Sequence, residues 1–296
     1  MANPLTPTFG MLLLTLFLQS ILYGMGLLQA WLYFLWYQKD GWFIKISVVL
    51  ITLCETAETI LFFCASYLYL IDGFGDKKNL TLWNLPIRLV LLTTYLTIFV
   101  AQIYFAHCIY QLHRKDKVIP LLILALACVC FGGGIAQVVA NFKIQGFQEL
   151  GETKATRTVQ AVFALVGDIL ITVALCWRLN SSKGGIQSTN KLLNYLIITA
   201  INRGFLTMIS AALNLILFST EPGTFYFMLW VLLSGKFYMN SMLATLNTRG
   251  YAIGMAAENT LGDISLTTIK ISHPNQTAAS INVPEHPSAD DRKHVW

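Results

Sequence analysis

The sequence predicts an all-α membrane protein, a bundle of seven transmembrane helices with the N-terminus outside and the C-terminus in the cytoplasm. Of its 296 residues, 55% are hydrophobic and 12% are charged, and the mean hydropathy is +0.60. The apolar residues form blocks of about 18 residues or more, long enough to cross the roughly 30 Å hydrocarbon core of a bilayer. The basic residues lie mainly between these blocks, where they are typical of topology signals and not of a nucleic-acid surface.

Each expected span is an apolar block bounded by polar or charged residues. In chain order the spans are residues 9–37, 46–71, 87–112, 118–140, 158–177, 192–219 and 225–249. No basic residue precedes the first span, and Lys39 and Lys45 follow it, so we expect a retained signal anchor with the N-terminus outside. Under this topology the inner connections carry nine basic residues and the outer ones five, with Arg157 counted in an outer loop.

The second and third spans carry polar side chains at helical spacing. Glu55 and Glu58 are three residues apart in the second span and therefore share one face at mid-membrane depth. The polar loop after this span contains a sequon at Asn79, which we expect to be glycosylated because the topology places it outside. In the third span a polar stripe ends in Tyr104 and His107, and its spacing predicts that it faces the bundle interior.

The first and fourth spans contain glycines, and the fifth and sixth contain charged residues at mid-membrane depth. Gly24 and Gly26, and the glycine run 132–134, are expected to let neighbouring helices approach closely. Asp168 lies at the middle of the fifth span. Arg203 belongs to a stripe of polar residues spaced three or four apart in the sixth span, which predicts one polar face on that helix.

The seventh span carries Lys236 near its middle. At about 1.5 Å per residue, Lys236 lies some 16 Å from the start of the span, half-way through the hydrocarbon core. A charge at that depth costs about 3 kcal/mol on insertion scales, so Lys236 is expected to have a partner. The chain then becomes polar and rich in Ser, Thr and Pro. The expected domains are therefore a transmembrane domain, 1–249, and a disordered polar cytoplasmic tail, 250–296.

Ionisable side chains lie at similar depth in four of the expected spans. They are Glu55, Glu58, Asp168, Arg203 and Lys236. The arrangement of lowest cost turns all of them inward, pairs the two bases with two of the acids and protonates the third acid. Lys236 is expected to contact Asp168 or a glutamate of the second span, and Tyr104 and His107 to lie nearer the cytoplasmic end of the same interior. Two interpretations stay open: a structural clasp that sets helix register, and a polar pocket or proton-responsive switch.

A seven-helix protein with a polar interior favours a receptor-like or sensor-like function. The usual receptor marks are missing, since the third span ends CIYQLHRK without Asp-Arg-Tyr and the seventh has no Asn-Pro-x-x-Tyr. Lys236 suggests a retinal Schiff base, but the third span has no acidic counter-ion. The alternatives are a membrane-embedded enzyme, such as a cyclase of a lipid-like substrate with Glu55, Glu58 or Asp168 as proton donor, and a transporter of a small solute or protons.

The sequence contains no pattern that predicts a metal or cofactor. It has no His-box, CxxC, P-loop or nucleophilic-serine motif. The six cysteines fall inside apolar blocks, where single cysteines are mostly packing residues. We therefore expect no cofactor, no metal and no nucleic acid, and we expect the lipid bilayer and a small hydrophobic ligand as partners.

The segment SGKFYMNSMLATLNTR, residues 234–249, resembles the closing signature of basidiomycete seven-helix membrane proteins catalogued only as a domain of unknown function. YFAHCIYQL (104–112) and GDILITVALCWRL (167–179) are similar to other blocks of that family. The resemblance implies a fungal multi-pass protein of the plasma membrane or an endomembrane, without an established activity. Asn240 begins the core of the signature, where amides are expected to bind neighbouring helices. Arg203 departs from the family pattern, so its role is expected to be particular to this chain.

Overall fold

The computed structural model describes residues 6–73, 82–144, 146–184, 187–220 and 224–271. In this part of the chain, long α-helices make up almost the whole architecture. They are α1 (Met11–Trp36), α2 (Trp42–Tyr67), α3 (Leu85–Leu112), α4 (Val118–Lys143), α5 (Lys154–Ser181), α6 (Gln187–Thr220) and α7 (Tyr226–Ile271). Three short helical turns flank them: η1 (Thr6–Gly10), η2 (Leu68–Asp72) and η4 (Phe147–Thr153). The all-helical expectation is confirmed, because the described residues contain no strand beyond an isolated bridge between Leu82 and Gly146.

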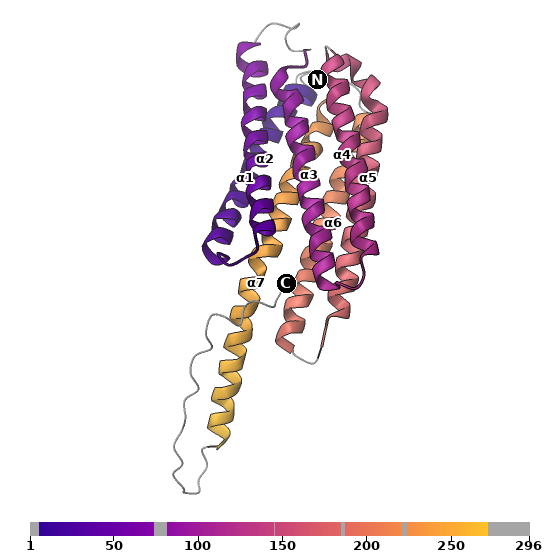
Figure 1. Ribbon diagram of the computed structural model, residues 1–296. Helices are drawn as coiled ribbons and strands as arrows, with labels where there is room; N and C mark the ends of the chain where they lie inside the picture. Colours follow the sequence, from indigo (N-terminus) through magenta and orange to yellow (C-terminus); the bar gives the residue numbers. More distant parts are fainter. Residues whose placement is uncertain (1–5, 74–81, 145, 185–186, 221–223, 272–296) are drawn as a thin grey trace.

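The helices run side by side along one axis (Figure 1), and the contacts between them close a ring. Each helix packs against the next one in the chain, and α7 also packs against α1, which closes the ring. Helix α7 reaches across to α2 and α3, and α3 reaches across to α5. Of the span within α3, 61% is buried, against 22% for the first span and 28% for α4. Helices α3 and α7 therefore form the centre of the bundle.

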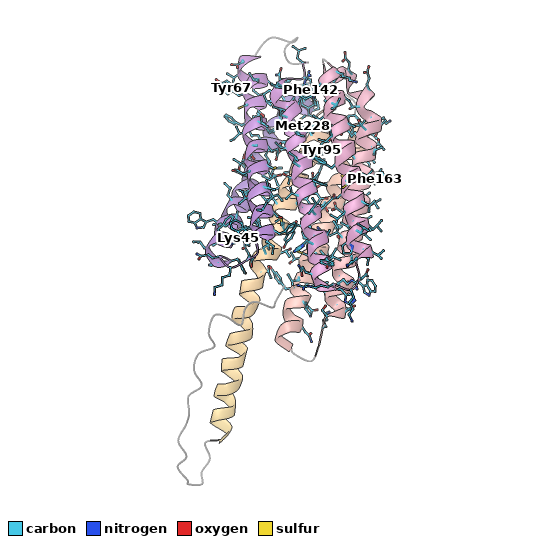
Figure 2. All side chains as sticks on the ribbon, viewed as in Figure 1. Lys45, Tyr67, Tyr95, Phe142, Phe163 and Met228 are labelled. Atoms are coloured by element: carbon cyan, nitrogen blue, oxygen red, sulfur yellow. The ribbon has the colours of Figure 1, made fainter. Side chains whose placement is uncertain are left out.

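The outside of the bundle is apolar. Large hydrophobic side chains are more than half exposed there, among them Phe17 on α1, Leu121 on α4 and Phe205 on α6. Figure 2 shows such side chains pointing away from the helices along the height of the bundle. Six described helices are long and apolar enough to cross a membrane. The chain is therefore a multi-pass membrane protein, and its apolar surface faces lipid.

Helix α7 is not one of these six, although it runs through the same bundle. Lys236, Tyr238 and Asn240 lower its hydropathy, but all three contact other helices, since α7 packs against α1, α2, α3 and α6. A helix surrounded by protein tolerates polar groups that lipid would not. The seventh crossing and the orientation of the termini stay predictions.

Helix α7 also continues beyond the expected end of the last span at Arg249, to Ile271. The part of the chain after Arg249 that stays helical has Ala, Met, Glu and Leu and no proline before Pro274, so nothing in its composition stops the helix. The boundary expected at residue 250 is thus not a helix end. Residues 272–296 lie outside the described residues, and disorder of the tail stays a prediction.

Residues near the ends of the expected spans lie at the two ends of the bundle. Figure 2 places Tyr67 and Phe142 at one end, and Lys45 at the opposite end, where α7 leaves the bundle. Asn79 lies outside the described residues, so its glycosylation stays a prediction. Helix α5 begins at Lys154 and not at Thr158.

Arg157 was expected in an outer loop, and the structure places it inside α5 with only 2% of its surface exposed. Arg157 therefore does not belong to the connection between α4 and α5 in which the charge count had placed it.

Glycines determine how closely two pairs of helices pack. A Cβ atom at Gly134 would lie 2.7 Å from Cγ of Tyr95, and one at Gly26 would lie 2.8 Å from Sδ of Met239. These contacts join α4 to α3 and α1 to α7. A Cβ atom at Gly24 or Gly132 would meet nothing within 4 Å. The expected close packing is thus confirmed at one glycine of each segment.

Replacing Gly134 with alanine is expected to destabilise the bundle by about 1–3 kcal/mol, because the new methyl group overlaps the buried ring of Tyr95. The same change at Gly132, on the same helix, is expected to be neutral or to stabilise by up to about 1 kcal/mol through helix propensity. Unfolding of both variants in identical mixed micelles measures the difference. Equal effects at the two positions would contradict a packing role for Gly134.

Candidate functional site

All five ionisable side chains expected at mid-membrane depth are buried, and none exposes more than 3% of its surface. The structure divides them into two groups, and each group includes a residue of α7. We call them the Lys236 group (Glu55, Glu58 and Lys236) and the Asp168 group (Asp168, Arg203 and Tyr238). A single constellation of five, as the sequence suggested, is therefore not what the fold forms.

The Lys236 group joins α7 to α2. The Lys236 ammonium lies 2.6 Å from Oε2 of Glu55 and also forms an ion pair with Glu58. The sequence left open whether Lys236 meets Asp168 or the glutamates, and the structure selects both glutamates. The ring of Tyr23, on α1, has its centroid 5.7 Å from Nζ of Lys236 and offers its face to the cation.

Local sequence explains why this group forms. The spacing of three residues brings both carboxylates to the side of α2 that faces α7. On α7 the residue before Lys236 is Gly235, and a Cβ atom there would lie 2.6 Å from Oε1 of Glu55. The missing side chain thus leaves the space that the Glu55 carboxylate occupies.

The charges of the Lys236 group do not balance when every member is ionised. Two carboxylates and one ammonium sum to −1, in a place where all three side chains have no exposed surface. The group therefore has one more acid than base, and its ion pairs hold α7 against α2 as a helix clasp.

The Asp168 group joins α5, α6 and α7. The hydroxyl of Tyr238 lies 2.6 Å from both carboxylate oxygens of Asp168. Arg203 donates from Nη2 to Oγ1 of Thr172 at 3.3 Å, and its Cζ atom lies 4.0 Å from the centroid of the Phe105 ring. No ion pair within the described residues includes Arg203. The expectation that Arg203 pairs directly with an acid is therefore wrong, because a tyrosine of α7 takes the carboxylate instead.

Two cavities adjoin the Asp168 group. The large cavity has a volume of about 70 Å³ and lies between α2, α3, α5, α6 and α7. Its polar lining residues are Tyr104, His107, Gln111, Arg203 and Thr245, and most of its other lining residues are apolar. The small cavity has a volume of about 30 Å³, and its polar lining residues include Asp168, Thr207, Ser210, Asn214 and Tyr238. Arg203 thus contributes to one cavity, while Asp168 and Tyr238 contribute to the other.

Tyr104 and His107 lie in the wall of the large cavity. The imidazole of His107 packs on the ring of Phe43, with centroids 4.3 Å apart. Its Nε2 atom lies 3.4 Å from the side-chain nitrogen of Gln111. The structure therefore brings both predicted residues to the same cavity as Arg203, which the sequence could only place at a nearby depth.

Asn240 has a different setting from the other candidates. Its amide nitrogen donates to the carbonyl of Leu22 at 2.9 Å and to that of Lys236 at 2.8 Å. Seven residues further along α7, about two turns, Asn247 donates to the carbonyl of Gln29 at 2.8 Å. Both amides therefore fasten α7 to α1, and Asn240 lines neither cavity.

Arg157 is a buried charge that the sequence analysis assigned to a loop. Its guanidinium lies over the rings of Phe218 and Phe227, with centroids 4.0 and 4.5 Å away. When the Gln137 side-chain amide is oriented with its oxygen toward Arg157, this oxygen accepts from Nε and Nη2 of Arg157 at 3.0 and 3.1 Å. The amide nitrogen then donates to the Tyr95 hydroxyl. A spacing of eleven residues places Arg157 on the same face of α5 as Asp168, and this signal was available in the sequence.

An ion pair outside the membrane spans holds the end of the bundle near the large cavity. Arg178, at the end of α5, pairs with Asp116 in the connection between α3 and α4. The backbone N–H of Val118 donates to the same carboxylate at 3.0 Å. This N–H and then the Arg178 guanidinium lower the pKa of Asp116 below its ordinary value, so Asp116 is charged at neutral pH.

The described residues contain no group of three or more His, Cys, Asp or Glu side chains arranged to hold a metal ion.

Residues 164–251 match the family described as "Family of unknown function (DUF6534)". The matched region covers most of α5, all of α6 and the start of α7, and it includes Asp168, Arg203 and Lys236. Comparisons with curated proteins and with solved structures each give no match. The apolar bundle and this similarity together support an integral membrane protein of unknown activity.

Proposed function

We propose that this chain is a receptor-like membrane sensor that binds a small apolar ligand in the large cavity and transmits binding through α7. The observation that carries the proposal is the position of Arg203. It lines the large cavity, and its guanidinium contacts α5 through Thr172 and α3 through Phe105. A ligand in the cavity would thus meet a charged side chain that already joins three helices.

The size and lining of the large cavity suit a small molecule. A buried void needs about 10–15 Å³ to hold one water, so the cavity volume of about 70 Å³ corresponds to roughly five waters. Leu175, Leu179 and Leu196 contribute apolar surface, and a few polar groups provide orientation. An apolar cavity with few convergent polar groups is typical of a ligand site.

Helix α7 is suited to carry a signal. Tyr238 fixes it to Asp168 and Lys236 fixes it to α2, and Thr245 on the same helix lines the large cavity. The helix then extends to Ile271, past the ends of the other helices (Figure 1). A ligand that favours one of two positions of α7 would shift the population of the extension, which lies on the expected cytoplasmic side.

The proposal is tested with benzyl alcohol and the full chain in phosphatidylcholine nanodiscs. The wild type is expected to be stabilised against heat and to change amide hydrogen exchange in residues 226–248. Filling the large cavity with Ala200→Phe is expected to abolish both effects, whereas Ala211→Phe, on the same helix but in the small cavity, keeps them. No stabilisation of the wild type, or equal responses of the two variants, would overturn the proposal.

A transporter of a small solute or protons is the second candidate, favoured by the two cavities that share the Asp168 group. Flux of protons into proteoliposomes, lost in Asp168→Asn, would favour it over a sensor. Turnover of a lipid extract, lost in Glu55→Gln, would instead favour the enzyme alternative.

A further inference from the structure

We infer that the ligand of the large cavity is a small apolar carboxylic acid whose carboxylate binds Arg203. This inference rests on the proposed ligand-binding function and names its ligand class. It follows from the donors that Arg203 leaves unused, from the charge around it, and from the size of the cavity.

Arg203, which lines the large cavity, has unused hydrogen-bond donors. Only 3% of its surface is exposed. Among the described residues its Nε and Nη1 atoms have no hydrogen-bond partner, and the bond from Nη2 to Thr172 is long at 3.3 Å. Guanidinium N–H groups that are buried without acceptors are costly, so an acceptor in the cavity would be bound favourably.

The charge of Arg203 is incompletely compensated by the protein. Asp168 is the acid that faces Arg203. Both oxygens of its carboxylate accept from the Tyr238 hydroxyl, and the carboxylate forms no ion pair with Arg203. The face of the Phe105 ring attracts the guanidinium, which replaces part of the lost hydration. A ligand carboxylate would supply a full counter-charge and charge-assisted hydrogen bonds.

The volume and the apolar lining of the cavity determine the size and polarity of the part of the ligand that carries the carboxylate. Space for roughly five waters accommodates a short chain or a single ring. Leu112, Leu175, Leu179 and Leu196 surround this space with apolar surface. An amine of the same shape would face the Arg203 cation without an acidic residue in the cavity lining, and a neutral alcohol would leave the charge uncompensated.

Three ligands of one shape, benzoate, benzyl alcohol and benzylamine, test the inference at neutral pH in phosphatidylcholine nanodiscs. The wild type is expected to bind benzoate at least about tenfold more tightly than benzyl alcohol, and benzylamine most weakly. Arg203→Met is expected to bind benzoate and benzyl alcohol equally. Arg203→Lys, which keeps the charge but loses the planar group, is expected to keep a smaller preference for benzoate.

The outcomes separate this inference from the proposed function. The wild type could bind benzyl alcohol without preferring benzoate, or the preference for benzoate could survive unchanged in Arg203→Met. Either result overturns the inference that the ligand is a carboxylic acid bound by Arg203, and leaves the sensor proposal standing. Loss of binding of all three ligands by the wild type overturns the sensor proposal itself. If Arg203→Met does not fold, as shown by loss of benzyl alcohol binding, an undiminished benzoate preference in Arg203→Lys overturns the inference.

Discussion

Replacing Lys236 with methionine is expected to destabilise the bundle by about 3–5 kcal/mol, the largest effect of a single substitution at the candidate site. Methionine fills much of the volume of the lysine stem, so packing of α7 changes little. Glu55 and Glu58, however, would lie side by side without surface exposure and without a positive partner. Titration of the folded protein with sodium dodecyl sulfate in mixed micelles measures the loss.

A control substitution and a compensating triple variant show whether the loss of stability comes from the unpaired glutamates. Lys115→Met, at an exposed position in the connection between α3 and α4, is expected to change stability by no more than about 0.5 kcal/mol. The triple variant Glu55→Gln, Glu58→Gln, Lys236→Met is expected to recover most of the loss, because replacing a whole buried ion group by neutral residues is often harmless. A triple variant as unstable as Lys236→Met would show that the cost is not the stranded negative charge.

Replacing Tyr238 with phenylalanine is expected to destabilise the bundle by about 1.5–3 kcal/mol, the range for a hydrogen bond to a charged group. The ring stays, and only the hydroxyl that lies 2.6 Å from both oxygens of Asp168 is lost. Because only 1% of the Asp168 surface is exposed, the lost donor can be replaced only by a water in the small cavity. Unfolding under the conditions used for Lys236 measures the change.

A control on the same helix and a double-mutant cycle isolate this contact. Tyr226→Phe is expected to be nearly neutral, because the Tyr226 hydroxyl has no hydrogen-bond partner among the described residues. Combining Tyr238→Phe with Asp168→Asn is expected to cost less than the sum of the two single changes, by about 0.5–3 kcal/mol. Strict additivity of the two changes would contradict direct coupling between Tyr238 and Asp168.

The sequence predicted the expected spans and the burial of their charges from local properties alone. Six of these spans are confirmed as helices long and apolar enough to cross a membrane. Glu55 and Glu58 share a face of α2 because a helix repeats every 3.6 residues, and this needs no knowledge of other helices. Hydropathy also explains the Arg157 error, since a basic residue beside a polar loop is usually part of it.

The partners of each charge were not predictable in the same way. The rise per residue gives depth, and Asp168 lies at a depth similar to that of the glutamates, so the sequence had no basis for choosing among them. The choice depends on which helices are neighbours and on how each one is rotated. Tyr238 lies two residues after Lys236, so it points away from α2 and reaches Asp168 on α5.

By itself, the sequence determined that this chain crosses a membrane several times and that its mid-span charges turn inward, because the free energy of placing a residue in lipid depends mainly on the residue and its depth. Only the tertiary structure decided that Lys236 meets two glutamates, that Tyr238 occupies the carboxylate of Asp168, and that Arg203 is left facing an apolar cavity. Those contacts join residues far apart in the chain, and helix order and rotation around the ring determine them.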